Sequence, residues 1–186
     1  MAQGSRNLRS VCVFCGSSDA VRADYLDAAR AVGRSLAARR LALVFGGGRT
    51  GLMGALADAA LEAGGQAIGV IPRHFNDPAR AHGGLSELHV VETMHARKAM
   101  MAELADAFLA LPGGYGTLEE LFEALTWAQI GLHDNPVGLL NVEGYYDPLL
   151  ALIERLGAQG FVAKEHHALL ISEADPERLL DRLEAR

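Results

Sequence analysis

Two carboxylates follow a glycine-rich loop in residues 109–120, which read Leu-Ala-Leu-Pro-Gly-Gly-Tyr-Gly-Thr-Leu-Glu-Glu. The apolar start predicts a strand, and Glu119 and Glu120 fall in the first turn of a predicted helix. Glycines let backbone N–H groups approach a ligand closely, and a helix start adds free donors and a partial positive charge. This combination suits a phosphate, and the carboxylates indicate chemistry at a bond close to it.

Glu120 also has a purely structural interpretation. Thr117-x-x-Glu120 matches a capping box, in which the glutamate side chain caps the backbone N–H of the threonine. Glu119 and Glu123 could simply complement the dipole of the predicted helix, residues 118–130. Thr126 lies two turns from Glu119 on the same side of that helix, so both could face the same rim.

Arg97 and Lys98 lie in a predicted helix, residues 94–104. At about 100° per residue, Arg97 falls in the middle of the apolar stripe of this helix. A buried guanidinium needs an anionic partner, such as a phosphate or a carboxylate. The alternative is an arginine whose stem extends outward to solvent. Lys98 is one of only two lysines in the chain and lies beside Arg97, so a ligand contact competes with simple solvation.

Strand-like and helix-like segments alternate along the whole chain. Strands are expected at residues 11–15, 41–45, 66–71, 88–91, 107–111, 137–141 and 169–171. Helices are expected at residues 23–39, 52–63, 94–104, 118–130, 146–156 and 176–184, with an irregular stretch at 72–86. This order predicts an α/β fold: a doubly wound parallel sheet with helices on both faces. Residues 9–186 form a single nucleotide-binding domain in this prediction, and residues 1–8 a flexible tail.

Three strand-to-helix loops carry unusual residues, and the predicted sheet places them on one rim. They are residues 15–19 with Ser17, residues 45–54 with Gly47 and Gly48, and the loop after residue 111. A single glycine cluster can be no more than a tight turn, but three on one rim indicate a ligand site.

The second loop contains G-x-G-x-x-G, which is typical of dinucleotide binding. However, it follows the second strand, and Pro72-Arg73 ends the next strand where an acidic residue is expected. Arg49-Thr50 is also no Gly-Lys-Ser/Thr of a P-loop. A nucleoside monophosphate or a sugar phosphate therefore fits better than NAD or ATP.

Composition narrows the class further. The chain of 186 residues is half hydrophobic, enough for one core, and its net charge of −6 argues against nucleic-acid binding. No apolar run approaches the ~20 residues of a membrane span, and the polar start lacks the apolar centre of a signal peptide, so the cytoplasm is the default location.

Cys12 and Cys15 are predicted to point to opposite faces of a strand and to pack in the core as reduced thiols. No His/Cys cluster has zinc spacing, so neither a metal nor another cofactor is predicted.

Residues 112–120 match P-G-G-x-G-T-x-x-E, with Arg97-Lys98 as the upstream pair. On these motifs the chain resembles the Lonely Guy (LOG) family of cytokinin riboside 5′-monophosphate phosphoribohydrolases. The resemblance covers nearly the whole chain and includes residues 14–18, 46–54, 127–129 and 139–146.

The resemblance implies a Rossmann-like fold and a homodimer that hydrolyses the N-glycosidic bond of an N6-modified adenosine 5′-monophosphate to free base and ribose 5-phosphate. Arg97 and Glu120 would be catalytic. The positions carried over as substrate-binding are Lys98, Gly114, Tyr115, Gly116, Thr117, Leu118, Glu119 and Thr126. Plant-like members have a substrate-binding glutamate in the segment that matches residues 78–84, and this chain has none.

Two alternatives remain beside this reading: a broader nucleoside 5′-monophosphate nucleosidase, and a nucleotide-binding protein without catalysis. Similar sequences also carry the label lysine decarboxylase. A pyridoxal phosphate enzyme needs a Schiff-base lysine and a partner for the pyridine nitrogen. Lys98, next to an arginine and upstream of a phosphate loop, is poorly suited to that role.

Overall fold

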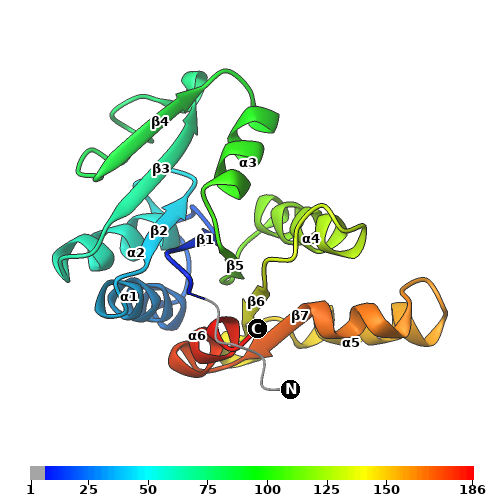
Figure 1. The fold of residues 1–186 in the computed structure, drawn as a ribbon. Coiled ribbons are helices and arrows are strands. Elements are labelled where there is room, and N and C mark those ends of the chain that lie inside the picture. Colours follow the sequence, from blue (N-terminus) through cyan, green and yellow to red (C-terminus); the bar gives the residue numbers. More distant parts are fainter. Residues whose placement is uncertain (1–6) are drawn as a thin grey trace.

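The computed structural model describes residues 7–186, so most of the predicted tail, residues 1–8, lies outside the described residues. Within these described residues, seven strands form one parallel sheet in the order β4-β3-β2-β1-β5-β6-β7 (Figure 1). The strands are β1 Ser10–Phe14, β2 Ala42–Phe45, β3 Ala67–Pro72, β4 Glu87–Val91, β5 Ala107–Ala110, β6 Val137–Leu140 and β7 Leu170–Glu173. Residue 8, a leucine in the predicted tail, is buried in the core.

Residues 7–186 contain six α-helices, five of them between strands and α6 after β7: α1 Ala23–Ala38, α2 Gly51–Glu62, α3 Met94–Glu103, α4 Tyr115–Gln129, α5 Asp147–Ala158 and α6 Pro176–Glu184. Three short 3₁₀ turns complete the described chain: η1 Arg73–Phe75, η2 Val142–Gly144 and η3 Lys164–Leu169. None of the helices in residues 7–186 combines the length and the apolar character needed to cross a bilayer.

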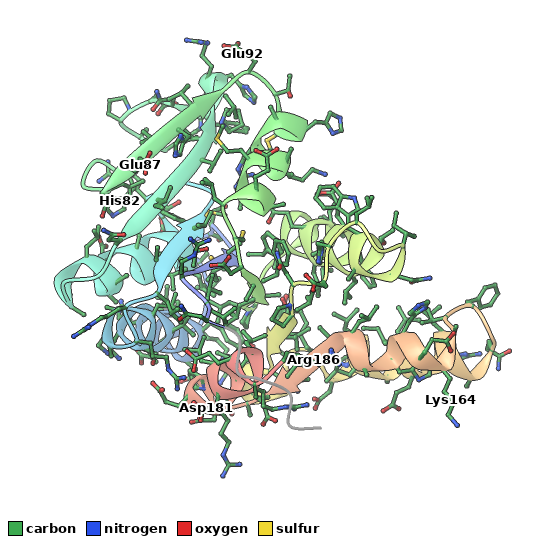
Figure 2. All side chains as sticks on the ribbon, viewed as in Figure 1. His82, Glu87, Glu92, Lys164, Asp181 and Arg186 are labelled. Carbon is green, nitrogen blue, oxygen red and sulfur yellow. The ribbon has the colours of Figure 1, made fainter. Side chains whose placement is uncertain are left out.

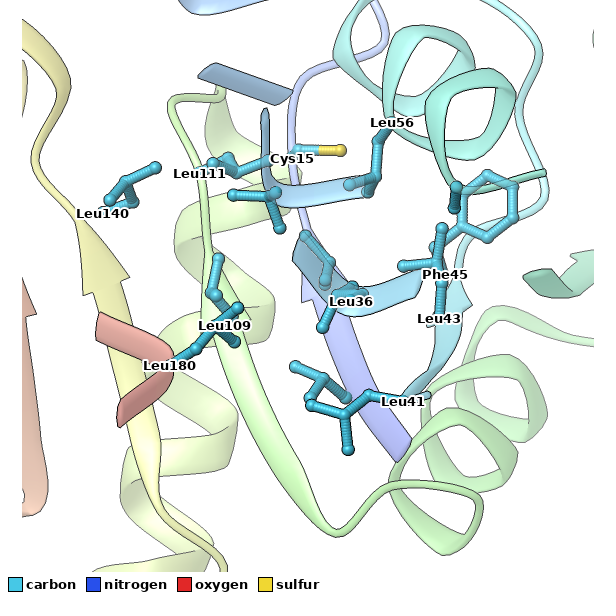
Figure 3. Close-up of a cluster of buried hydrophobic side chains, with 14 of the residues drawn as sticks. Cys15, Leu36, Leu41, Leu43, Phe45, Leu56, Leu109, Leu111, Leu140 and Leu180 are labelled. Atoms are coloured by element: carbon cyan, nitrogen blue, oxygen red, sulfur yellow. The ribbon is translucent and has the colours of Figure 1, made fainter. Parts of the chain in front are cut away.

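Helices cover both faces of the sheet, as predicted. One core cluster joins the sheet to α1, α2 and α6 (Figure 3), and a second cluster joins it to α3 and α4. Strands β1, β5 and β6 are buried along their whole length, because side chains on both faces are covered. Cys15 belongs to the first cluster and Cys12 to the second, which confirms that these free cysteines face opposite sides of the sheet.

The chain order reverses between β1 and β5. Strands β1 to β4 follow one another in one direction, and β5 then returns to the other side of β1. In open parallel sheets of this kind, ligands bind beyond the carboxyl ends of the strands at such a reversal. The loops after β1 and β5 meet there, where the Gly16 N–H donates to Pro112 O at 3.1 Å.

Candidate active site

A cleft of about 370 Å³ lies at the carboxyl edge of β1, β2 and β3. Its lining combines hydroxyls, glycine-loop backbone and two guanidiniums with apolar side chains. The lining residues are Ser17, Gly46, Gly48, Thr50, Met53, Ile71, Pro72, Phe75, Ala79, Arg80 and Arg97. The volume falls within the range typical of small-molecule sites.

Arg97 is buried at the base of this cleft, with 9% of its surface exposed. Its Nε donates to Val70 O at 3.1 Å, and its Nη1 lies 3.5 Å from Glu120 Oε1. A methyl group on Gly46 would lie 1.8 Å from Arg97 Nη2, so the glycine leaves the space that the guanidinium fills. Arg97 is therefore buried against a carboxylate, as its place in the apolar stripe predicts, and does not extend outward to solvent.

Glu120 is also buried, with 7% of its surface exposed. Burial raises the pKa of its carboxyl, and the Arg97 charge acts in the opposite direction. The pair thus places an acid with a raised pKa next to a permanent cation at the switch in strand order.

The predicted capping box is wrong. Helix α4 begins at Tyr115, three residues earlier than expected, and Gly114 is its N-cap without a side-chain cap. Thr117 lies inside the first turn and is buried, and a methyl group on Gly113 would lie 2.1 Å from its Oγ1. Because Gly113 has no side chain, Thr117 can pack beneath the loop, and the helix begins at Tyr115 and not at the predicted residue 118. Glu120 therefore has no capping role.

Lys98 lies on the other side of Glu120 and pairs with two further glutamates. Its Nζ contacts Glu119 and lies 2.9 Å from Glu123 Oε1. Burial acts to lower the pKa of Lys98, but the hydrogen bonds to both carboxylates raise it above its usual value. Lys98 is thus held as a cation, and Glu119 is engaged in an ion pair while Glu120 faces Arg97.

The first turn of α4 is open to a ligand. No residue in the described part of the chain accepts a hydrogen bond from the N–H groups of Tyr115, Gly116 or Thr117. A side chain added at Gly114 or Gly116 would meet no atom within 4 Å, and Tyr115 is 94% exposed. The open N–H groups suit an anion.

The start of α2, which follows the other glycine-rich loop, is occupied by the protein itself. Asp19 Oδ1 accepts from the Gly51 N–H at 2.8 Å, and Gly16 O accepts from the Leu52 N–H at 2.9 Å. A phosphate would have to displace both acceptors to bind there.

The remaining predicted ligand residues divide between the cleft and its surroundings. Ser17 and Gly48 line the cleft. Gly47 lies against β3, where a side chain on it would lie 3.4 Å from Ile71. Leu118 packs partly buried against the core cluster of α3 and α4. Thr126 is exposed near the far end of α4 and donates to the carbonyl of Phe122 at 2.6 Å, so the structure does not bring it to the cleft.

The outer wall of the cleft comes from the irregular stretch 72–86, and the sequence motifs singled out none of its lining residues. Phe75 and Arg80 line this wall, with the Arg80 guanidinium 5.8 Å from the centre of the Phe75 ring. The wall is joined to the glycine loop because the Arg49 N–H donates to Arg80 O and the His82 N–H donates to Gly47 O, both at 2.9 Å. These contacts span about thirty residues, and no local motif signals them. Figure 2 marks His82 near the β3–β4 edge.

The described residues contain no group of three or more histidine, cysteine or acidic side chains that could hold a metal ion.

The fold and the cleft at the carboxyl edge of β1, β2 and β3 define a Rossmann-like α/β protein with a candidate small-molecule site. A family model described as possible lysine decarboxylase matches residues 53–183. A cytokinin riboside 5′-monophosphate phosphoribohydrolase of Rhodococcoides fascians is 51% identical over 177 residues, covering 95% of this chain and 89% of the relative. Two plant proteins are similar over 95% of this chain and 78% of their own length. They are a probable cytokinin riboside 5′-monophosphate phosphoribohydrolase of Oryza sativa subsp. japonica, at 51% identity, and a cytokinin riboside 5′-monophosphate phosphoribohydrolase of Arabidopsis thaliana, at 49%. The chain belongs to this family, the Lonely Guy family.

Solved structures with the same fold are more distant in sequence. A molybdenum cofactor binding protein from Rippkaea orientalis superposes with a TM-score of 0.71 at 20% identity, covering 97% of this chain and 98% of that one. The molybdenum cofactor carrier protein of Chlamydomonas reinhardtii gives a TM-score of 0.72 at 24% identity, with coverages of 96% and 99%. At these identities the likeness establishes the fold alone.

The residues present do not suit pyridoxal phosphate, which the description of the family model would imply. The chain has two lysines. Lys98 is held as a cation by two glutamates, so its amine is not free to attack an aldehyde. Lys164 is exposed in η3, away from the cleft (Figure 2).

Proposed function

We propose that this protein hydrolyses the N-glycosidic bond of adenosine 5′-monophosphates, N6-modified ones included, to free base and ribose 5-phosphate. The names of relatives about 50% identical support the activity. The observation that carries it is the buried pair of Arg97 on α3 and Glu120 on α4, the helix whose first turn is open. At about 1.5 Å per residue, Glu120 lies roughly 7 Å along α4 from the Tyr115 N–H. A phosphate at the helix start would therefore bring its ribose toward the carboxylate.

The substrate would lie along the cleft with its anionic end at α4. The free N–H groups of residues 114–117 would bind the 5′-phosphate. Ser17 lines the cleft and follows Gly16, whose N–H donates to Pro112 O in the loop before α4. Ile71 and Phe75 offer apolar surface for a purine at the other end. Binding energy at the phosphate then positions the sugar for reaction.

Hydrolysis forms a bond from water oxygen to C1′ while the bond from C1′ to the base nitrogen breaks, and the proton released by water ends on the base. Positive charge develops on the sugar as the bond breaks, and the Glu120 carboxylate can stabilise that charge or accept the proton of the water. Arg97 keeps its proton, so it acts by donating hydrogen bonds to the departing base or to the phosphate.

The direct test offers the purified protein AMP, N6-isopentenyl-AMP, GMP, CMP and UMP, and identifies the products by chromatography. We expect free base and ribose 5-phosphate from the two adenine nucleotides. Release from all five would establish the broader nucleosidase instead. Binding of AMP without any base after prolonged incubation would overturn the catalytic proposal.

The proposal includes a homodimer in the cytoplasm. An apolar groove of about 380 Å³ runs between α3 and the end of α4, and Leu132 beside it is 68% exposed. Such a surface suits a second copy of the chain. Light scattering after gel filtration should give twice the chain mass for the parent and a lower mass for Leu132→Asp. Cell fractionation tests the location.

A further inference from the structure

Three consecutive carbonyl oxygens in the loop before α4 each accept a hydrogen bond. The donors and distances are Tyr146 Oη to Leu111 O at 2.6 Å, the Gly16 N–H to Pro112 O at 3.1 Å, and Tyr145 Oη to Gly113 O at 2.8 Å. Two of the three donors are adjacent tyrosines in the segment 139–146, which the proposed reaction does not use. The loop is therefore fixed on its carbonyl side.

The hydrogen bond to Gly113 O also sets the direction of a neighbouring donor. In a planar trans peptide, the carbonyl of one residue and the N–H of the next point in opposite directions. Since Gly113 O points to Tyr145, the Gly114 N–H points away from it. No described residue accepts from this N–H, and a side chain on Gly114 would meet no atom within 4 Å. The Gly114 N–H is thus aimed at open space beside the first turn of α4.

The chain after β6 is folded so that Tyr145 reaches this carbonyl. Glu143 in η2 has a φ of 50°, a left-handed conformation that turns the chain back sharply. Asn141 Oδ1 then accepts from the Tyr146 N–H at 2.8 Å, which closes the turn. The Tyr145 ring packs edge-on against Tyr25 of α1, with 5.5 Å between ring centres. Its hydroxyl is therefore held in place by its own surroundings.

We propose that Tyr145 is a positioning residue for phosphate binding: its hydroxyl orients the peptide between Gly113 and Gly114 so that the Gly114 N–H donates to the 5′-phosphate. This inference rests on the proposed function for the identity of the ligand. It adds a residue that contacts no substrate atom and acts through one peptide group.

Tyr146 provides a matched control. Its hydroxyl makes the same kind of hydrogen bond to the same loop, but the residue after Leu111 is Pro112, which has no N–H to orient. Loss of the Tyr146 hydroxyl should therefore lower stability without a specific effect on phosphate. If Tyr145 merely held the loop in place, Tyr145→Phe would likewise lower stability without a specific effect on phosphate binding.

The experiment compares Tyr145→Phe and Tyr146→Phe in a Glu120→Gln background, where ligand turnover is slow. Calorimetry measures the Kd of AMP and of adenosine for each protein. We expect Tyr145→Phe to weaken AMP binding about 3- to 10-fold, the effect of losing one hydrogen bond, and to change adenosine binding less than about twofold. Tyr146→Phe should change the ratio of the two affinities less than about twofold. Addition of inorganic phosphate should shift the Gly114 amide resonance in the Tyr145 parent and shift it less in Tyr145→Phe.

An unchanged AMP affinity in Tyr145→Phe, or an equal loss for AMP and adenosine, overturns the inference. Should Tyr145→Phe lower the melting temperature more than Tyr146→Phe does, the amide resonance at a temperature where both are folded decides the matter. The proposed reaction is judged separately, by base release from the parent protein. A parent that binds AMP and releases no base disproves the reaction, and the affinities still decide the role of Tyr145.

Discussion

The chain builds two glycine-rich loops that each end in a helix, and the structure uses them differently. At the start of α2, Asp19 and the Gly16 carbonyl occupy the N–H groups of Gly51 and Leu52. At the start of α4, the corresponding N–H groups have no acceptor among residues 7–186. Both starts carry the same partial positive charge, so the difference lies in which one the protein has already neutralised.

This contrast shows that glycine spacing alone does not identify a phosphate site. The loop before α2 has the better match to a dinucleotide fingerprint, yet its glycines serve close packing. A side chain on Gly51 would lie 2.6 Å from the backbone of Ser17, and one on Gly54 would lie 2.2 Å from Arg49 O. At the start of α4, Gly113 packs against Thr117, but Gly114 and Gly116 stay at the open surface. A phosphate site therefore needs unoccupied N–H groups as well as glycines.

The largest expected effect tests whether the catalytic carboxylate lies on α4, the helix whose first-turn N–H groups are free. Glu120→Gln keeps the size of the side chain and removes its charge. We expect kcat with AMP to fall at least ~100-fold, because the group that stabilises the sugar or takes up the proton is lost. Steady-state assays on the folded variant, checked by circular dichroism, measure this.

Glu119→Gln is the matched control on the same turn of α4. Glu119 is engaged with Lys98, so its loss should lower kcat less than about fivefold. A Glu120→Gln enzyme with parental turnover, or a larger loss for Glu119→Gln, would move the chemistry away from Glu120.

Replacing one glycine by alanine at the start of α2 and one at the start of α4 should separate an effect on stability from an effect on AMP binding. Gly51 has a φ of +60° and no room for a side chain, so Gly51→Ala should cost about 2–4 kcal/mol of unfolding free energy. Gly116→Ala should leave stability within about 1 kcal/mol, because the site is open and alanine favours helix. However, Cβ atoms tilt toward the helix N-terminus, so the new methyl would crowd a bound anion and weaken AMP binding about tenfold.

Urea unfolding and calorimetry measure the two quantities. Equal AMP affinity for Gly116→Ala and the parent would show that the anion does not sit on the first turn of α4.

The pH dependence of activity should report the coupling between Arg97 and Glu120. If the Glu120 carboxylate must be ionised, kcat/KM falls as the pH drops through its pKa, which burial holds above the usual value. The Arg97 charge lowers that pKa, so Arg97→Gln should raise it, and the acidic limb should move to higher pH. Residual activity between pH 4 and 8, or NMR titration of the Glu120 carboxyl, gives the shift. An acidic limb that moves to lower pH would contradict the pairing.

How much of this contrast the sequence predicts depends on how local each feature is. The alternation of apolar strands and helices predicts the parallel sheet and the helices on both its faces. The apolar stripe of the predicted helix at residues 94–104 predicts the burial of Arg97. The start of α4 was placed three residues late, because Gly114 and Gly116 are poor helix formers and Thr117 has the usual cap chemistry. The contact from Asp19 to Gly51 joins residues 32 positions apart, and no spacing rule reveals it. The sequence alone therefore does not predict which helix start has free N–H groups, because the residues that accept from those groups are brought close only by the fold.

The smallest expected effect comes from opening the α2 start. Asp19→Ala frees the Gly51 N–H, and the loss of this cap should cost about 1 kcal/mol of unfolding free energy. Asp19→Asn keeps an acceptor oxygen and should cost less. AMP affinity should stay within about twofold in both variants, since Asp19 is outside the cleft and the phosphate is expected at α4. An Asp19→Ala variant that binds inorganic phosphate at a second site would show that the cap itself keeps anions off α2. A fivefold loss of AMP affinity at unchanged stability would instead place the substrate phosphate between the two helix starts.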